Sequence, residues 1–341
     1  MNGPDHCVLA GDIGGTNTRL ALVDVGSRQT RILHKATYPS RDYDSLDAVL
    51  AAFSETHRQP LQAACLGVAG PVHGQTAQVT NLPWHLDAGD IAAQLALEKV
   101  SLLNDLEATA WGLRTLQHED LLALQTGNRD RRGNTAIIAA GTGLGEAGLY
   151  FDGQRHRPFA TEGGHSDFSP QTELDMVLLR HLLKQHDHVS WERVVSGDGL
   201  VSIHACLCEL RQRAIPDWLQ QLMHEGDAAA ANSSAAQQRR DAICTEALGL
   251  FVHLYGVEAG NLALKLMATG GLYIAGGIAP KIQAQLQDGS FIKAFHAKGR
   301  MRTLMERMPV MVVLNDDVAL QGAAVFTVSR GATGHDSTTN L

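Results

Sequence analysis

Residues 8–17 read Val-Leu-Ala-Gly-Asp-Ile-Gly-Gly-Thr-Asn, and this stretch decides the fold. The apolar run Cys7–Ala10 predicts a buried strand, the glycine-rich run after it predicts a turn, and Arg19–Val25 predicts a second strand. The pattern is therefore that of a β-hairpin. It does not fit a Walker loop, because no Gly-x-x-x-x-Gly-Lys-Ser/Thr stretch occurs in the chain. A Rossmann turn is also a poor match, since a helix would follow its glycines.

The turn of this hairpin has the composition of a phosphate-binding loop. Its glycines expose backbone N–H groups that can surround phosphate oxygens, and Thr16 adds a hydroxyl donor. Asp12, at the end of the buried strand, could hold Mg²⁺ directly or through water. A plain hairpin turn also favours Asp, Gly and Asn, so this turn alone leaves both interpretations open.

A second hairpin of the same kind follows later in the chain. Thr135–Ala139 predicts a strand, Gly141-Thr142-Gly143-Leu144-Gly145 a turn, and Ala147–Phe151 a returning strand. Two such turns in one chain favour phosphate binding over coincidence. They also predict a protein of two related halves that close around a ligand.

Length and composition limit the classes of function. With 341 residues the chain is long enough for two domains. A net charge of −8 without a basic block argues against a nucleic-acid partner, because phosphate backbones need clustered Lys and Arg. Five scattered cysteines show no zinc-binding spacing and fit a reducing compartment. The N-terminus lacks a signal-peptide pattern, and no apolar run approaches the ~20 residues of a membrane span. We therefore expect a cytoplasmic protein with no membrane partner.

The stretch Leu103-Asn104-Asp105-Leu106-Glu107 has two interpretations. Asn104 followed three residues later by Glu107 matches a helix capping box, which is a structural role. A carboxylate such as Asp105 at the carboxyl end of a strand also lies where α/β proteins bind ligands. Position alone does not separate the two.

Three further stretches place polar or glycine residues beside strands or helix starts. Glu162-Gly163-Gly164-His165 predicts a loop that brings Glu and His together, although a lone His more often only donates or accepts hydrogen bonds. Glu192, after Ser190-Trp191, is also typical of an acid in the first turn of a helix. The strand Leu272–Ala275 ends in Gly276-Gly277, which fits either a flat surface for a planar base or a tight turn.

The second half of the chain is mostly helical by its apolar spacing. The pattern predicts helices over Leu174–Gln185, Glu192–Leu210 and Arg240–Leu266. The low-complexity run Ala228–Ser234 predicts an exposed loop or a frayed helix end.

Taken in order, these motifs resemble those of the bacterial glucokinase family, within the actin-like, ribonuclease-H-like ATPase superfamily. The resemblance runs from Ala10 nearly to the C-terminus. Its specific parts are Glu-Gly-Gly-His-Ser-Asp-Phe at 162–168 and Glu-Arg-Val-Val-Ser-Gly at 192–197, whereas the first hairpin and Ile-Ala-Gly-Gly-Ile at 274–278 occur across the superfamily. The resemblance implies a two-domain α/β protein of actin-like fold with an active-site cleft between the domains.

The resemblance also implies an activity and the residues that perform it. It implies a phosphotransferase that moves the γ-phosphoryl group of ATP to the 6-hydroxyl of D-glucose, at the entry to glycolysis, with Asp105 as the base. The sugar would be held by Asn104, Asp105, Glu162, His165 and Glu192. ATP and Mg²⁺ would be held by Gly11, Asp12, Ile13, Gly14, Gly15, Thr16, Gly141, Thr142, Gly143, Gly276 and Gly277, with Asp12 on the metal. Asn261 is a further candidate on the nucleotide side, and the family suggests a homodimer.

Several finer expectations follow. We expect a small α/β domain from residues 1–115 with 310–330, a large one from 116–309, and a disordered tail at 331–341. No Cys-rich zinc loop like that of the related repressor–kinase family follows His165, so no zinc is expected there. The alternatives are a kinase of another hexose or an N-acetylhexosamine, since one pocket contact can decide between epimers, and a non-catalytic actin-like ATPase switch. A switch would leave the acids of the sugar set without a role.

Overall fold

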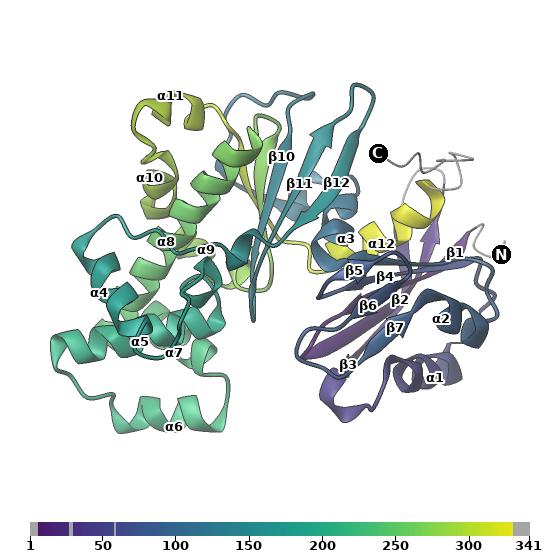
Figure 1. The fold of residues 1–341 in the computed structure, drawn as a ribbon, viewed down its shortest axis with the longest axis horizontal. Helices are drawn as coiled ribbons and strands as arrows, with labels where there is room; N and C mark the ends of the chain where they lie inside the picture. The colour runs from purple at the N-terminus through teal and green to yellow at the C-terminus, as the bar shows by residue number, and fades with distance from the viewer. Residues whose placement is uncertain (1–5, 27–29, 58, 330–341) are drawn as a thin grey trace. The chain divides into compact units, whose positions relative to one another are not determined.

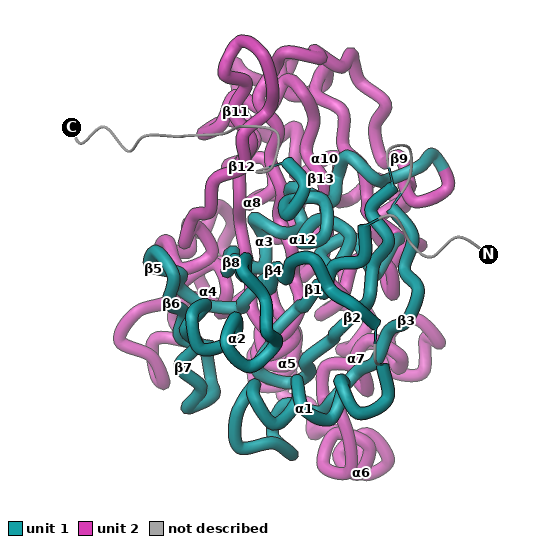
Figure 2. Tube along the Cα trace, turned by 90° about the vertical axis from the view of Figure 1, so that its right-hand side faces the viewer, with its two compact units in different colours: residues 1–118, 315–341 teal, residues 119–314 magenta. Residues whose placement is uncertain are grey.

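The computed structural model describes residues 6–26, 30–57 and 59–329. The chain forms two compact units, residues 1–118 with 315–341 and residues 119–314, which Figure 2 shows in different colours. The boundary expected at residue 310 moves to 314, because Val310–Val313 (β14) is a strand of the second unit's sheet. The tail expected to be disordered, 331–341, lies outside the described residues.

The first unit is built on a five-stranded sheet with a small three-stranded sheet beside it. Its strands are β1 (Cys7–Ile13), β2 (Asn17–Val25), β3 (Thr30–Pro39), β4 (Ala63–Val68), β5 (Val72–His73), β6 (Thr76–Gln78), β7 (His85–Asp87) and β8 (Val100–Asn104). The large sheet has the order β3-β2-β1-β4-β8, and the small one is β5-β6-β7. β1, β2 and β3 are antiparallel neighbours, whereas β1, β4 and β8 run parallel. All six residues of β4 are buried, as is typical of a central strand covered on both faces.

Four helices cover the two faces of this sheet (Figure 1). They are α1 (Leu46–Thr56), α2 (Ala88–Leu95), α3 (Asp105–Gly112) and α12 (Val318–Ser329). α1 and α2 share a buried cluster with Leu9 and Leu66, and α3 and α12 share another with Val8 and Cys65. Because neighbouring residues of a strand point to opposite faces, Val8 and Leu9 belong to different layers of the core.

The second unit is built on a six-stranded sheet in the order β12-β11-β10-β13-β14-β9. Besides β14, its strands are β9 (Leu121–Gln125), β10 (Thr135–Ala140), β11 (Leu144–Phe151), β12 (His156–Thr161) and β13 (Gly271–Ala275). β10, β11 and β12 are antiparallel neighbours, and β10, β13 and β14 run parallel.

Helices of the second unit form one large hydrophobic core against this sheet (Figure 1). They are α4 (Glu173–Leu182), α5 (Gly197–Arg211), α6 (Asp217–Glu225), α7 (Ala228–Gln237), α8 (Ala242–Leu266), α9 (Gln283–Leu286), α10 (Ser290–His296) and α11 (Arg302–Met305). Within the described residues α8 is the one helix long and apolar enough to cross a membrane. Most of it is buried inside the unit, as in the central helix of a globular core.

The two large sheets repeat one topology. In each, a hairpin and a third antiparallel strand are followed by two parallel strands, so the spatial order is third, second, first, fourth, fifth. The second unit adds β9 at its edge. The prediction of two related halves, made from the two hairpins, is confirmed at the level of the sheets.

Several local predictions differ from the structure. The helix predicted over Glu192–Leu210 begins only at Gly197, where the Ser196 side chain caps it. The first hairpin has longer strands than expected: Gly11, Asp12 and Ile13 lie in β1, because the ladder with β2 continues to Ile13↔Thr18. The run Ala228–Ser234 is helix rather than loop. α7 forms there because Asp227 caps it and its inner face packs into the core through Ala235 and Ala236.

Candidate active site

The first glycine-rich turn lies at the carboxyl end of β1. Gly14 donates its N–H to Asn17 O (3.0 Å), which closes the turn and leaves the Thr16 side chain exposed. Gly11 has a packing role, because a Cβ atom there would lie 2.4 Å from Leu66 Cδ2. The part of the motif that can meet a ligand is therefore Gly14–Thr16.

Asp12 is paired inside the first unit. Arg19 donates two N–H groups to Asp12 Oδ2, from Nε at 3.0 Å and from Nη2, and also donates Nη1–H to Asp316 O. The guanidinium fixes the Asp12 carboxylate next to the turn, and both contacts use the same oxygen. Asp12 can thus serve a hydrated cation through Oδ1 more readily than it can enclose a bare one.

Asn104 and Asp105 lie on the same edge of this sheet as the first turn. Ile13 is paired with Val68, and Val68 with Asn104, so three parallel strands end together. At ~4.8 Å per strand, the turn and Asp105 are about 10 Å apart along this edge. Ligands in open α/β sheets bind at such an edge.

Asn104 is the N-cap of α3, as the capping interpretation predicted. Its Oδ1 accepts the N–H of Leu106 at 3.0 Å, and its Nδ2 donates to Gly70 O at 3.4 Å. Asp105 is the first residue of the helix and is half-buried. The cap fixes the start of α3 and therefore the position of the Asp105 carboxylate.

The second glycine-rich turn lies beside a helix start and a second glycine pair. Gly197 N–H, at the first residue of α5, donates to Gly141 O at 2.9 Å. Ile278 N–H donates to Ala140 O at 3.2 Å, so Gly276 and Gly277 adjoin the turn along the carboxyl ends of β10 and β13. The free N–H groups of a helix N-terminus favour an anion, which suits a site that binds phosphates.

The two glycines after β13 differ in what they require. Gly276 has φ of +83°, and a Cβ there would lie 2.5 Å from Ala140 O, so the tight-turn interpretation holds for it. A Cβ at Gly277 or at Gly141 would have no atom within 4 Å. These two positions are therefore open to a ligand.

Glu162, His165 and Glu192 come together in the second unit. His165 Nε2 lies 3.8 Å from Glu162 Oε2, and His165 Nδ1 lies 4.0 Å from Glu192 Oε1. Glu162 and His165 have side chains more than half exposed, whereas the Glu192 side chain is 29% exposed. The structure thus assembles two carboxylates and an imidazole from segments thirty residues apart in the chain.

Backbone pairing explains this assembly. The segment after His165 and the segment before Glu192 form a short antiparallel bridge, in which Phe168 N–H donates to Val189 O and Trp191 N–H to Ser166 O. The Trp191 ring is buried and meets Phe168 edge to face. This aromatic pair anchors both segments, so the polar side chains next to it are held at the surface.

Glu192 also contacts the second glycine-rich turn. Its Oε2 accepts the N–H of Leu144 at 3.0 Å, and a Cβ on Gly143 would lie 2.4 Å from the same oxygen. Gly143 is glycine because the carboxylate occupies that space. An open pocket of ≈ 400 Å³ adjoins this carboxylate, and it is lined by His165, Gln185, His186, Asp187, His188, Ser190, Glu192 and Arg193. Glu192 therefore contacts both this pocket and the glycine-rich turn at Gly143.

The loop that carries Glu162 and His165 rests on a buried carboxyl group that the sequence did not reveal. A Cβ on Gly163 would lie 1.9 Å from Glu146 Oε2, and one on Gly164 would lie 2.0 Å from Leu144 O. The double glycine therefore lets the loop lie directly on β11. The signal available in the sequence was a charged residue, Glu146, in an otherwise apolar strand.

Glu146 is paired with a second buried acid, Glu258 on α8. Both are at most 2% exposed. Burial, together with the neighbouring Glu258, raises the pKa of Glu146 to about 8. Burial also raises the pKa of Glu258, against the effects of Asn261, which donates to Glu258 Oε2 at 2.7 Å, and of Lys265. The pair therefore holds a proton at neutral pH, since two carboxylates in contact cannot both ionise in the interior.

Asn261 is occupied within this network. Besides its bond to Glu258, its Oδ1 accepts a hydrogen bond from Lys298 Nζ at 2.6 Å. Burial lowers the pKa of Lys298 to about 8. These contacts give Asn261 a structural role in the core next to α8.

Comparisons with known proteins show the family of the chain. The family model described as glucokinase matches residues 9–330. The glucokinase of Nostoc sp. (strain PCC 7120) is 42% identical over 334 residues, which cover 93% of this chain and 98% of that protein. The glucokinase of Synechocystis sp. (strain PCC 6803) is 42% identical over 93% of this chain and 96% of that protein.

Solved structures agree as well. A glucokinase from an Antarctic psychrotroph has a TM-score of 0.81 and 32% identity, covering 95% of this chain and 99% of that one. The glucokinase of Balamuthia mandrillaris in complex with glucose has a TM-score of 0.79 at 22% identity, covering 95% of this chain and 94% of that one, and shows likeness of fold. The two repeated sheets are those of the actin-like ATPase fold of such sugar kinases. The chain belongs to the glucokinase family.

Proposed function

We propose that the protein is an ATP-dependent glucose kinase that transfers the γ-phosphoryl group of ATP to the 6-hydroxyl of D-glucose. The observation that carries this proposal is the gathering of Glu162, His165 and Glu192 beside the glycine-rich turn at Gly143. A neutral hexose offers only hydroxyl groups, so its site needs several convergent acceptors and donors. Two carboxylates and an imidazole provide these.

Different residues hold the sugar and accept the proton of its attacking hydroxyl. Glu162, His165 and Glu192 hold the sugar hydroxyls, with Asn104 as a further partner. Asp105 accepts the proton that the attacking hydroxyl loses as its oxygen bonds to phosphorus. The helix start that Asn104 caps keeps the Asp105 carboxylate fixed, so little reorganisation is needed at the moment of transfer.

The glycine-rich turns hold the nucleotide. The exposed backbone and hydroxyl of Gly14–Thr16 in the first unit and of Gly141–Gly143 in the second bind phosphate oxygens. Gly277 contacts the adenine base, because no atom of the described residues fills the space where its Cβ would lie. Asp12 fits Mg²⁺ held through water, because Arg19 already occupies one of its oxygens. Mg²⁺, when bound, neutralises phosphate charge during the transfer.

Finer features of this function rest on the family. Glucose 6-phosphate formation places the enzyme at the entry to glycolysis in the cytoplasm, and a homodimer is the expected assembly. The reducing environment is supported by five free cysteines, all within the described residues.

The test is ADP release from ATP and Mg²⁺ with glucose, mannose, N-acetylglucosamine, acetate or no acceptor. We expect glucose-dependent release that falls by ~10²–10⁴-fold in kcat in Asp105→Asn, because a general base contributes that much. Glu107→Gln, an acid on the same helical turn, is the control and should retain activity. Release without any acceptor would overturn the kinase in favour of an ATPase, and preference for another acceptor would overturn glucose as the substrate.

A further inference from the structure

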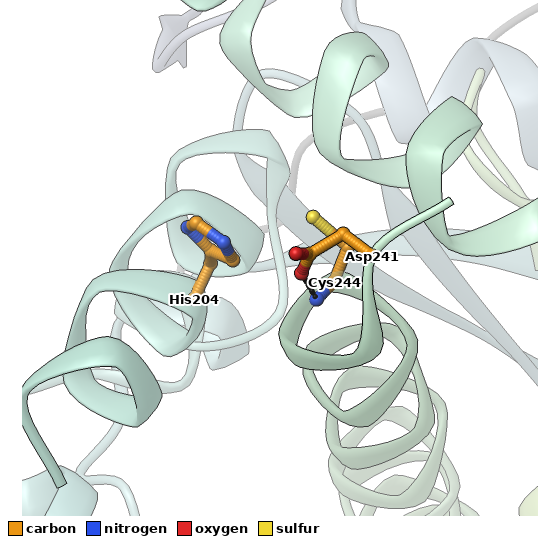
Figure 3. A group of neighbouring side chains, drawn as sticks. All are labelled: His204, Asp241 and Cys244. Atoms are coloured by element: carbon orange, nitrogen blue, oxygen red, sulfur yellow. Dashed lines mark hydrogen bonds between the residues drawn. The ribbon is translucent and has the colours of Figure 1, made fainter. Parts of the chain in front are cut away.

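A second group of polar side chains lies in the helical interior of the second unit. His204 on α5, Asp241 at the N-cap of α8 and Cys244 in the first turn of α8 face one another (Figure 3). One ligand-type atom from each lies within 4.8 Å of the others. None of the three belongs to the sugar or nucleotide residues, and the family motifs leave them without a role.

One ring nitrogen of His204 lacks a hydrogen-bond partner among the described residues. The residue is 1% exposed, and its Nδ1 is buried without a hydrogen-bond partner in the described part of the chain. Burial disfavours the charged ring and lowers the pKa of His204. A neutral imidazole has one nitrogen with a free lone pair, and this is the form that binds metal ions. A buried polar atom that lacks a partner is destabilising unless something fills the gap.

The start of α8 is suited to a thiolate ligand. Asp241 Oδ1 accepts the N–H of Cys244 at 2.8 Å, which holds the carboxylate beside the Cys244 side chain. Cys244 Sγ now donates to Asn232 Oδ1 at 3.3 Å. A bound divalent cation displaces the thiol proton to solvent, and the helix N-terminus then stabilises the negative sulfur.

A further sulfur lies next to the group. Cys208 is one turn after His204 on α5, and its Sγ is 3.7 Å from His204 Nε2. The ligands of a tetrahedral Zn²⁺ lie ~3.3–3.8 Å apart, given metal–ligand bonds of about 2.0–2.3 Å. The ligand atoms of His204, Asp241 and Cys244 lie within 4.8 Å of one another, so side-chain movements of about 1 Å bring these three to such distances.

We propose that His204, Asp241 and Cys244 supply three of the ligands of one structural Zn²⁺ ion. The mixed nitrogen, sulfur and oxygen donors select a borderline-soft cation rather than Mg²⁺. The ion ties the middle of α5 to the start of α8, two helices joined in the chain through α6 and α7. This site is distinct from the loop after His165, where no zinc was expected.

Zinc content of the full-length, tag-free chain tests the proposal. After dialysis against excess Zn²⁺ and removal of unbound ion, we expect one zinc per chain in the wild type. We expect close to none in Cys244→Ala and in His204→Gln. Cys206→Ala, a buried thiol on the same helix outside the group, is the matched control and should keep its zinc. Equal zinc in the wild type, Cys244→Ala and His204→Gln would overturn the proposal.

Two measurements on the wild type do not depend on whether the variants fold. Co²⁺ in place of Zn²⁺ should give the intense near-ultraviolet absorption of a cobalt–thiolate bond. Zinc should also raise the Tm by about 5 °C, since an ion that binds only the folded chain stabilises it. Cobalt without thiolate absorption, or a Tm that zinc leaves unchanged, would contradict a buried cysteine-containing site.

Discussion

The two units share a sheet topology but use their glycine-rich hairpins differently. In the first unit Gly11 is needed for packing against Leu66, and Asp12 beside the turn is held by Arg19. In the second unit Gly143 is needed to make space for the Glu192 carboxylate. The same motif therefore serves the core in one half and the polar site in the other.

This difference follows from what is inserted after each hairpin. In the second unit β11 leads through β12 into Glu162–His165, and the bridge to Trp191 brings Glu192 back to the turn. In the first unit the corresponding edge carries Asn104 and Asp105 at the end of β8. A repeated sheet thus positions two glycine-rich turns, and the proposed division of work, with the sugar held by one half and the base supplied by the other, follows from the segments added to it.

The largest expected effect among these comparisons is in the second unit. Glu192→Ala removes a carboxylate that accepts the Leu144 N–H and lies beside His165. Losing a hydrogen bond to a charged group costs ~1.5–3 kcal/mol, so the KM for glucose should rise by about 10–100-fold. Steady-state kinetics measure this, with the exposed acid Glu173→Ala as control. An unchanged KM would mean that Glu192 serves only the turn.

A pair of glycine substitutions separates the two hairpins. Gly11→Ala forces a methyl group against Leu66, and overpacking of this kind costs ~1–3 kcal/mol, so the Tm should fall by several degrees. Gly143→Ala pushes on Glu192 at the surface, so glucose KM should rise by about 10-fold while the Tm stays within about 1 °C. Thermal unfolding and kinetics on both variants check this. A raised glucose KM in Gly11→Ala together with a lowered Tm in Gly143→Ala would contradict the proposed difference between the two units.

The smallest expected effect concerns the buried pair Glu146 and Glu258, which lies under the loop Glu162–His165. The pKa of Glu146 is raised from 4.5 to about 8, so the folded chain binds more protons than the unfolded chain between these values. Stability contributed by the protonated carboxyl is therefore fully present below pH 4.5 and is lost as the pH rises towards 8.

Glu146→Gln keeps the shape of the neutral acid and should reduce that loss. Between pH 5 and 7.5 we expect the Tm of Glu146→Gln to fall by a few degrees less than the Tm of the wild type. The control Glu173→Gln should show the same fall as the wild type. Lys298, whose pKa is lowered to about 8, stays mostly protonated over this range. Identical pH profiles for Glu146→Gln and the wild type would show that the pair is not protonated at neutral pH.

The sequence predicted those parts of the fold and site that depend on local patterns. The two hairpins, the strand Leu272–Ala275 and the cap at Asn104 follow from apolar runs and short-range chemistry, and the structure confirms them. The run Ala228–Ser234 was misjudged, because the helix that contains it packs into the core mainly through Asn232, Ala235 and Ala236, and this packing depends on other helices.

Residues that act through tertiary contacts were missed. Glu146 gave no local sign that it lies under Gly163, and Trp191 gave none that it packs on Phe168. His204 and Cys244 are forty residues apart, so their proximity has no spacing pattern. Such pairs are set by how helices and loops pack on the sheet, which a pattern along the chain does not encode.

Calorimetric titration of glucose into Asp105→Asn and Glu192→Ala tests the central claim most directly. The claim is that the second unit holds the sugar while Asp105 of the first unit removes its proton. Asn at position 105 keeps an acceptor for the hydroxyl, so this variant should bind glucose within a few-fold of the wild type while its turnover is lost. Glu192→Ala should bind glucose about 10–100-fold more weakly. Loss of glucose binding in Asp105→Asn together with normal binding in Glu192→Ala would contradict the account.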